Sequence, residues 1–208
     1  MPTISYAITA CNEHVELERL LVQLQEHIRP EDEIIVQLDS NHTNEVKAVA
    51  DKYNVMGSKC EYHRIIFGLN GDFASFKNNL KSHCTRDYIF QIDADEYLSE
   101  TLVEWLPSIL ENNTDIEMLS VPRINTVEGL TEQHIKQWGW NVNKEGWVNY
   151  PDYQNRILKN KPEIYWVNKV HEKIIGAITT AEMPCGLDLI HPKTIEKQEK
   201  QNNFYNTL

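Results

Sequence analysis

Short runs of apolar and β-branched residues alternate with longer stretches of helical spacing along the first part of the chain. Strands are predicted at residues 4–9, 33–38, 60–66 and 88–92, and helices at residues 16–27, 43–53 and 72–82. In the first predicted helix, four leucines recur at helical spacing before Pro30 (Leu17, Leu20, Leu21 and Leu24). This alternation predicts an α/β fold with a mostly parallel, Rossmann-like sheet and helices on both faces.

The pattern changes after residue 120. Residues 122–156 are rich in Trp, Asn, Gly and Tyr and have weak periodicity, which favours loops and short strands over regular strand–helix units. Further short strands are predicted at residues 165–167, 169–175 and 187–190. From residue 193 on the chain is polar, and we expect a helix or a frayed tail there.

Composition narrows the class of protein. The 208 residues carry 20 Lys and Arg against 31 Asp and Glu, a formal net charge of -11, which argues against a nucleic-acid partner. No stretch is long and apolar enough for a transmembrane helix, and the first residues do not resemble a signal peptide. The four cysteines form no C-x-x-C pair, so a reduced, cytoplasmic location is the simplest interpretation.

The strongest candidate for chemistry is a D-x-D motif at the end of the fourth predicted strand. Asp93 and Asp95 are separated by one residue and directly follow a buried apolar run. Carboxylates in this position can bind Mg²⁺ or Mn²⁺, which would bridge and neutralise the two phosphates of a nucleotide-sugar. Asp-rich turns are also common on protein surfaces, so the alternative is a solvated turn.

Other polar residues have a functional and a structural interpretation each. Asp39 follows the second predicted strand, where it would contact a nucleotide or cap the next helix. Asp152 lies among aromatic residues and could act as a base, or form an ion pair with Arg156. His171 and His191 could bind a metal, although a single histidine is more often structural.

Taken in order, these segments resemble family 2 inverting glycosyltransferases with the glycosyltransferase-A fold. Among them the chain looks most like the lipopolysaccharide-core glucosyltransferase type. The resemblance covers roughly residues 3–192 and rests on the following segments: ISYAITACNE (4–13), DEIIV (32–36) with DS (39–40), FASFKN (73–78), DADE (93–96), GW (146–147), YPDYQ (150–154), RIL (156–158), VHEK (170–173) and LIH (189–191).

The resemblance implies a role for each matched residue. Thr9, Asn12 and Glu13 would line the nucleotide pocket, and Asp39 would contact the base. Lys77, Asn78 and Ala94 would lie near the donor, and Asp93 would contact the ribose. Asp95 would bind the metal with His171, or less favourably with His191. Asp152 would deprotonate the acceptor hydroxyl, with Glu172 as its rival.

These roles imply one glycosyltransferase domain over residues 1–208. Residues 1–96 would form the nucleotide-sugar half, residues 97–192 the acceptor half, and residues 193–208 a polar tail. The donor would be a nucleotide-diphosphate-sugar, with UDP as the expected nucleotide, and the acceptor a saccharide or another hydroxyl compound. The loop DSNHTN (39–44) lacks the glycine and final acid that the family often has, and Pro192 follows His191 where an aromatic residue is common.

Two other functions are compatible with acids at strand ends. A nucleotidyltransferase also binds a metal there, but residues 9–14 contain neither the glycine nor the lysine expected of its phosphate loop. A non-catalytic module that binds a nucleotide-sugar or a glycan could share the fold. A turnover assay is needed to distinguish the module from an enzyme.

Overall fold

The computed structural model describes residues 1–55 and 59–205. Strands and helices alternate through its first half, as the sequence predicts. The elements of this half are β1 (Ile4–Ala10), α1 (His14–His27), β2 (Glu33–Asp39), α2 (Asn44–Val55), β3 (Glu61–Phe67), α3 (Phe73–Ser82) and β4 (Tyr88–Asp93).

The second half is less regular. Its elements are β5 (Tyr97–Leu98), α4 (Glu100–Asn112), β6 (Met118–Val121), β7 (Arg123–Glu128), α5 (Glu132–Trp138), β8 (Gln154–Lys159), β9 (Tyr165–Val167), β10 (Lys173–Ile175), β11 (Thr180–Glu182), β12 (Leu189–Thr194) and α6 (Ile195–Tyr205). Helices α4 and α5 are not among the predicted elements. The polar tail forms the end of β12 and a helix, α6.

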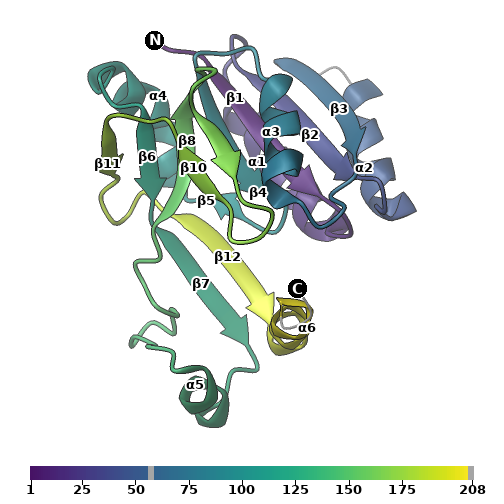
Figure 1. Cartoon of the computed structure of the whole chain (residues 1–208), viewed down its shortest axis with the longest axis vertical. Coiled ribbons are helices and arrows are strands. Elements are labelled where there is room, and N and C mark those ends of the chain that lie inside the picture. Colours follow the sequence, from purple (N-terminus) through teal and green to yellow (C-terminus); the bar gives the residue numbers. More distant parts are fainter. Residues whose placement is uncertain (56–58, 206–208) are drawn as a thin grey trace.

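The main sheet has seven strands in the order β11-β6-β8-β4-β1-β2-β3. The β1–β2, β2–β3 and β1–β4 pairs are parallel, while β8 runs antiparallel to both β4 and β6. The sheet is therefore mostly parallel, and β1 and β4 lie side by side with Thr9 opposite Asp93. In Figure 1 the carboxyl ends of β1, β2 and β4 point to the same lower edge.

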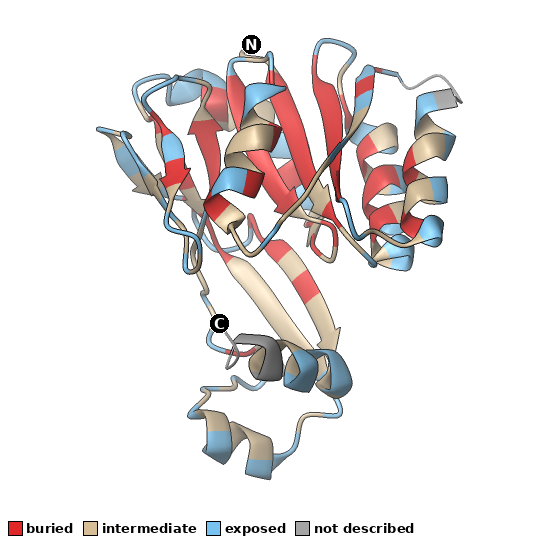
Figure 2. Cartoon of the chain, turned by 45° about the vertical axis from the view of Figure 1, so that its right-hand side comes forward, coloured by how far each residue is buried: buried red, intermediate tan, exposed pale blue. Residues whose placement is uncertain are grey.

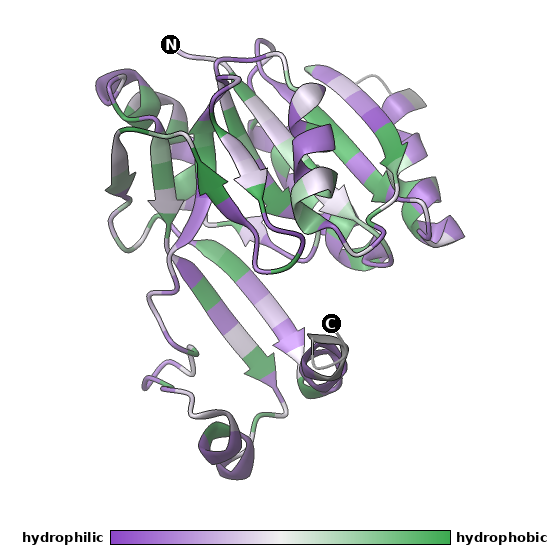
Figure 3. Cartoon of the chain, in the orientation of Figure 1, coloured by the Kyte–Doolittle hydropathy of each residue, from purple (hydrophilic) through white to green (hydrophobic). Residues whose placement is uncertain are grey.

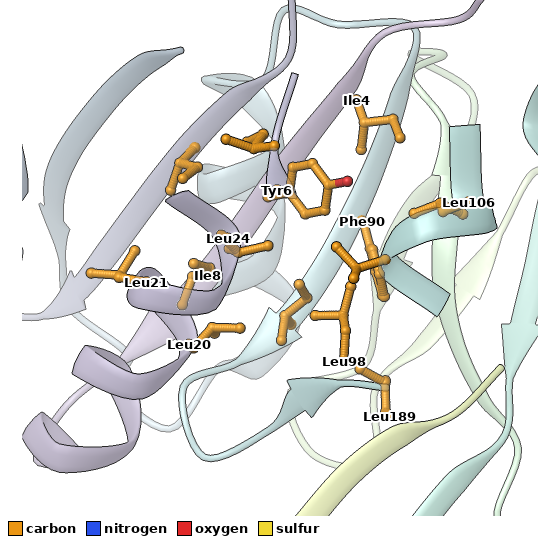
Figure 4. Packing of buried hydrophobic residues seen from close by; sticks show 14 of the residues in the cluster. Ile4, Tyr6, Ile8, Leu20, Leu21, Leu24, Phe90, Leu98, Leu106 and Leu189 are labelled. Atoms are coloured by element: carbon orange, nitrogen blue, oxygen red, sulfur yellow. The ribbon is translucent and has the colours of Figure 1, made fainter. Parts of the chain in front are cut away.

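Helices cover both faces of this sheet. Alternate strand residues point to opposite sides, and apolar side chains on each side are buried against helices. On one face, side chains of α1, α2 and α4 pack against Ile4, Tyr6, Ile8 and Phe90 (Figure 4). On the other face, Leu80 of α3 packs against Ala7, Ile35 and Ile89. The α/β fold with helices on both faces is thus confirmed.

A second sheet, in the order β5-β12-β7, extends below the first (Figure 1). Leu98 of β5 and Leu189 of β12 anchor it in the main core. The outer part of this sheet and the helices beside it, α5 and α6, contain few buried residues (Figure 2). The two helices are rich in hydrophilic residues (Figure 3). This sheet places residues from the second half of the chain below the carboxyl edge of the main sheet.

No helix among the described residues is long and apolar enough to cross a membrane. Cys11, Cys60, Cys84 and Cys185 all lie in the described part of the chain, and none of them forms a disulfide bond.

Candidate functional site

A cavity of about 460 Å³ lies where the two sheets meet. The ends of β1, β2 and β4 supply acids and Thr9, α3 supplies Lys77, and the second sheet supplies Arg123, His191 and Lys193. Predicted site residues that line the cavity are Thr9, Glu13, Asp39, Lys77, Asp93, Ala94, Asp95 and His191. The rival base Glu172 lines it as well. Asp93 and Asp39 gather here because neighbouring parallel strands end at the same edge.

Four predicted site residues do not line this cavity: Asn12, Asn78, Asp152 and His171. The Asn78 amide donates to the carbonyl of Trp166 at 2.7 Å and accepts from the Trp166 N–H at 2.9 Å, so it ties α3 to β9. Asn12 lies in the turn after β1, where its N–H donates to Glu13 Oε2 at 3.0 Å. Asn78 and the Asn12 backbone thus make structural contacts, and a donor-binding role for either side chain stays a prediction.

Asp39 lies at the end of β2 and is 6% exposed. Its Oδ1 accepts from the Asn41 N–H at 2.9 Å, which stabilises the turn that follows the strand. It does not cap α2, because the Thr43 hydroxyl accepts from the Val46 N–H at 3.3 Å in that position. Asp39 therefore does not cap a helix. It stabilises a turn in which its carboxylate lines the cavity.

Asp93 is held by three side chains. Its Oδ1 accepts from Thr9 and Gln91, each at 2.9 Å, and its Oδ2 accepts from the Arg156 guanidinium at 2.7 Å. Burial alone would raise the pKa of Asp93, but the charges of Arg156 and Lys77 hold this pKa well below its usual value. Asp93 is therefore ionised and fixed in place at neutral pH.

A buried network of charges continues behind Asp93. Glu96 is 0% exposed and its Oε1 accepts from both Arg156, at 2.7 Å, and Arg123, at 2.9 Å. Arg123 also donates to Asp152 Oδ2 at 2.6 Å and 2.9 Å. The sequence suggested an ion pair between Asp152 and Arg156, whereas the structure pairs Asp152 with Arg123 and Arg156 with Asp93 and Glu96. The reason is that β8 directs Arg156 toward β4.

Asp152 lies beside the cavity with its side chain 28% exposed. Its Oδ2 accepts from Arg123 and from Asn125, the latter at 2.8 Å, and its Oδ1 accepts from Gln154 at 2.8 Å. Burial would raise the pKa of Asp152, but the Arg123 charge and these hydrogen bonds lower it. The carboxylate is ionised at neutral pH, and Oδ1 is the less crowded oxygen.

His191 lies next to Asp95, with 3.3 Å between Nε2 and Asp95 Oδ2. Strand pairing causes this contact. His191 is opposite Asn125 in the parallel β7–β12 pair, and β12 also pairs with β5, which begins two residues after Asp95. His171 was expected to be the better metal ligand of the two, but the structure brings His191 to Asp95, while His171 lies outside the cavity lining.

The hydrogen bonds of Asn125 fix the tautomer of a neutral His191. The Asn125 Nδ2 donates to Asp152, so its Oδ1 faces His191 Nδ1 at 2.8 Å and accepts a hydrogen bond from the Nδ1–H. The Nε2 of neutral His191 then directs a lone pair at the Asp95 carboxylate. Two acceptors that face each other in this way can both bind one metal ion placed between them.

This arrangement fits a divalent metal. One carboxylate and one imidazole are suitable ligands for Mn²⁺, which accepts nitrogen more readily than Mg²⁺ does. No group of three or more His, Cys, Asp or Glu residues suited to a metal occurs within the described ranges 1–55 and 59–205. A metal held by Asp95 and His191 would therefore complete its coordination with ligand oxygens, as is usual for ions that bind with nucleotide phosphates.

Several cavity residues were not predicted from the sequence. Arg123 and Lys193 line it from neighbouring strands of the second sheet, and Gln201 of α6 reaches it from the polar tail. The sequence did contain a signal for Arg123 and Lys193. Arg123 is two residues from Asn125, and Lys193 is two residues from His191, so each pair shares one face of a strand. Pairing of the two strands, which brings the four together, was not foreseen.

Replacing Arg156 with methionine should lower the free energy of unfolding by about 3–5 kcal/mol, because Asp93 and Glu96 lose their shared partner inside the protein. Arg156 itself is 4% exposed. Urea unfolding would measure the loss. The control is Lys52→Met, which removes an ion pair with Glu18 between side chains 47% and 33% exposed and should cost at most about 1 kcal/mol. Equal losses of unfolding free energy in the two variants would contradict the proposal that the buried charge network stabilises the fold.

Comparisons with known proteins agree with this architecture. A sequence model described as glycosyl transferase family 2 matches residues 5–170. The fold is similar to that of TarS 1-349 from S. aureus in complex with UDP-GlcNAc, with a TM-score of 0.64 and 13% identity over 93% of this chain and 59% of that chain. TarS 1-349 in complex with UDP matches with a TM-score of 0.65, 12% identity, and 92% and 60% coverage.

A mannosyltransferase from Pyrobaculum calidifontis, PcManGT in complex with GDP-Man and Mn²⁺, matches over a smaller region. Its TM-score is 0.51 with 17% identity, over 59% of this chain and 36% of that chain. At these identities the likeness concerns the fold. The chain spans about three fifths of TarS 1-349, at 59% to 60% of its length.

Proposed function

Because the chain belongs to glycosyl transferase family 2, we propose that it transfers a hexosyl group from a UDP-sugar to an acceptor hydroxyl, with inversion and with Mn²⁺ or Mg²⁺. The α/β fold matches glycosyltransferase-A structures. The observation that carries the proposal is the convergence of Asp39, Asp93 and Asp95 on one cavity at the carboxyl edge of the parallel strands. The lipopolysaccharide-core glucosyltransferase type, suggested by the ordered sequence motifs, remains part of this proposal.

The donor is proposed to bind along the carboxyl edge. Asp39 would accept from the base, and Asp93 from the ribose hydroxyls, since both carboxylates are held by hydrogen bonds that fix their direction. Thr9, Glu13 and Ala94 would complete the wall of this pocket. The two structures with UDP and UDP-GlcNAc are of a protein with the same fold, which supports the choice of uridine.

Asp95 and His191 would hold the metal, which when bound neutralises charge on the departing diphosphate. Lys77, which also lines the cavity, can add a second positive charge. Its ammonium pairs with Glu172 at 2.6 Å and is 11% exposed, so it is already desolvated and directed by a partner. The GDP-Man complex of PcManGT contains Mn²⁺, which supports manganese as the first ion to test.

Asp152 is proposed as the base that takes the acceptor proton. It is ionised at neutral pH, and Arg123 and Asn125 hold its Oδ2, which leaves Oδ1 to receive the proton. Removal of the proton makes the hydroxyl oxygen a better nucleophile toward the anomeric carbon. A base on the side opposite to the leaving diphosphate would give inversion. We further propose that residues 1–96 mainly serve the donor and residues 97–192 mainly the acceptor, with His191 and Glu172 as exceptions because they line the donor cavity.

Metal-dependent release of UDP from a panel of UDP-hexoses, with and without added acceptors, tests the proposal. Release that needs Mn²⁺ and increases with an acceptor would support it, and anomer analysis of the product would test inversion. If UDP and Mn²⁺ bind but no UDP-hexose is turned over with any acceptor, the chain is a binding module of the same fold.

Asp39→Ala should weaken UDP binding about tenfold, because the base would lose one hydrogen bond. The melting temperature should change little, because within the protein the turn loses only the hydrogen bond from the Asn41 N–H. Calorimetry and thermal unfolding measure the two effects. The matched control is Asp72→Ala, which removes the N-cap of α3, where Asp72 accepts from Ser75. This control should cost about 1 kcal/mol of stability and leave UDP affinity unchanged. If the affinity of Asp39→Ala for UDP is unchanged, Asp39 only stabilises the turn after β2 and does not contact the base.

A further inference from the structure

A second, smaller cavity adjoins the first on the side of the second sheet. It has a volume of about 230 Å³ and lies between β7, β12, α6 and the loop after α5. Arg123, His191, Lys193 and Gln201 line both cavities, so the two are continuous. The volume is below the roughly 300–1,000 Å³ typical of drug-sized ligands and suits a single sugar ring.

The lining of this second cavity differs from the rest of the protein. The chain has a net charge of -11, yet no acidic side chain lines the cavity within the described part of the chain. Amide side chains dominate instead: Asn125, Asn149, Gln198, Gln201 and Asn202. An amide has two N–H donors and an acceptor oxygen, the combination that recognises hydroxyl groups. Some of these atoms already have partners, since Asn125 bonds Asp152 and His191, Gln201 accepts from Lys193, and Gln198 donates to Asn202. The remaining donors and acceptors can bind hydroxyls.

The two cations in the lining already have partners. Arg123 donates to Glu96 and Asp152, and the Lys193 ammonium donates to the Gln201 side chain. Their charge is therefore not available in full to an anionic group. The cavity is suited to neutral hydroxyls more than to a phosphate or a carboxylate.

Trp140 gives the cavity an aromatic wall. Its ring packs against Trp138 with 4.6 Å between centroids, and Trp138 stacks on His134 at 5.1 Å. Helix α5, which carries His134 and Trp138, has no buried residue, so this aromatic cluster contributes little to the core. An aromatic face can pack against the C–H face of a pyranose while nearby amides bind its hydroxyls.

The cavity also lies next to the proposed base. Asn125 lines it, and the Nδ2 of Asn125 donates to Asp152 at 2.8 Å. A hydroxyl of a ring in this cavity would thus approach the junction of Asp152, the metal pair and the donor cavity. We propose that this cavity is the acceptor subsite and that it takes a neutral saccharide stacked on Trp140, an inference that rests on the proposed function.

The test uses the full chain with UDP and the diamagnetic ion Mg²⁺ bound, because Mn²⁺ would broaden nearby signals, and follows the indole N–H signals of its tryptophans by NMR. The signal of Trp140 is assigned by its loss in Trp140→Phe. Glucose, galactose, N-acetylglucosamine, maltose and lactose are added in turn, with glucuronate and glucose 6-phosphate as anionic probes. We expect a saturable shift of the Trp140 signal with at least one neutral sugar, and none with the anionic probes.

Affinity measurements on variants complete the test. Trp140→Ala should weaken binding of the responding sugar by roughly tenfold, about 1.4 kcal/mol, while Trp140→Phe retains most of it. UDP affinity should stay unchanged in both, which shows that the variants are folded. The control is Trp105→Ala on α4, where Trp105 is 54% exposed, and it should alter neither ligand.

The outcomes separate the two proposals. No response of Trp140 to any neutral sugar, with UDP bound normally, overturns the acceptor subsite and leaves the donor site intact. A response to the anionic probes alone overturns the neutral assignment. Sugar binding at Trp140 without any UDP binding supports the subsite and contradicts the proposed donor instead.

Discussion

Asp95→Ala should abolish turnover and metal-dependent binding of UDP while the chain remains folded. Asp95 and His191 are the pair proposed to hold the metal, and removal of the carboxylate leaves a single imidazole. The effect should be near-complete, because without the cation the departing diphosphate keeps its charge. Calorimetric titration of UDP with and without Mn²⁺, together with a turnover assay, measures the two losses.

The two histidine variants make this test sharper. His191→Ala should weaken Mn²⁺-dependent UDP binding, whereas His171→Ala should leave it unchanged, since the structure places only the former among the cavity-lining residues. Electron paramagnetic resonance of Mn²⁺ gives a readout that does not depend on activity. Full turnover by Asp95→Ala, or by the unaltered chain in excess chelator, would disprove the metal proposal. A stronger effect of His171→Ala would restore the assignment expected from the sequence.

Asp152→Asn should reduce turnover by about 10²–10⁴-fold, the contribution typical of a general base, with binding of UDP and metal retained. The amide keeps the shape of the side chain, and its oxygen can still accept from Arg123 and Asn125. Its nitrogen would face the Gln154 amide, which can rotate to present its oxygen. Rates at saturating acceptor and donor, measured beside UDP affinity, separate loss of the base from loss of binding.

Glu172→Gln is the matched variant for this test. Glu172 lines the donor cavity and pairs with Lys77, so its replacement should weaken donor binding more than it lowers the saturated rate. Thermal unfolding of Asp152→Asn is needed as well, because Arg123 loses half of its charged partners. If Glu172→Gln loses turnover with donor binding intact while Asp152→Asn remains active, Glu172 is the base and Asp152 serves to hold Arg123.

The first half of the fold could be predicted from the sequence because its hydrophobic periods are unambiguous. The leucines of α1 and the apolar runs of β1, β2 and β4 lie where the pattern placed them. Helix α4 was harder, because it contains Pro107 in its interior, a residue that usually ends a helix. Helix α5 is short and has no buried residue, so no apolar stripe marks it.

The candidate site also contains residues that could be predicted from the sequence and residues that could not. Asp39, Asp93 and Asp95 could be placed together because the ends of parallel strands share an edge. The sequence favoured His171 over His191 as the metal ligand, whereas His191 lies beside Asp95, because β12 pairs with β5 and β7 across the chain. The partners of Arg156 were likewise unpredictable. The sequence suggested Asp152 as the partner, but Arg156 lies in a strand and bonds residues of the neighbouring strand β4, Gln91 and Asp93.

The pairing of His191 with Asp95 spans 96 positions of the chain. During synthesis on the ribosome, the parallel core of β1 to β4 can begin to form long before β12 has emerged. The metal pair, and the wall shared by the two cavities, are completed only when the last described strand docks between β5 and β7. A nascent or truncated chain that ends before residue 189 would therefore retain most of the acids of the carboxyl edge but should not retain metal-dependent nucleotide binding.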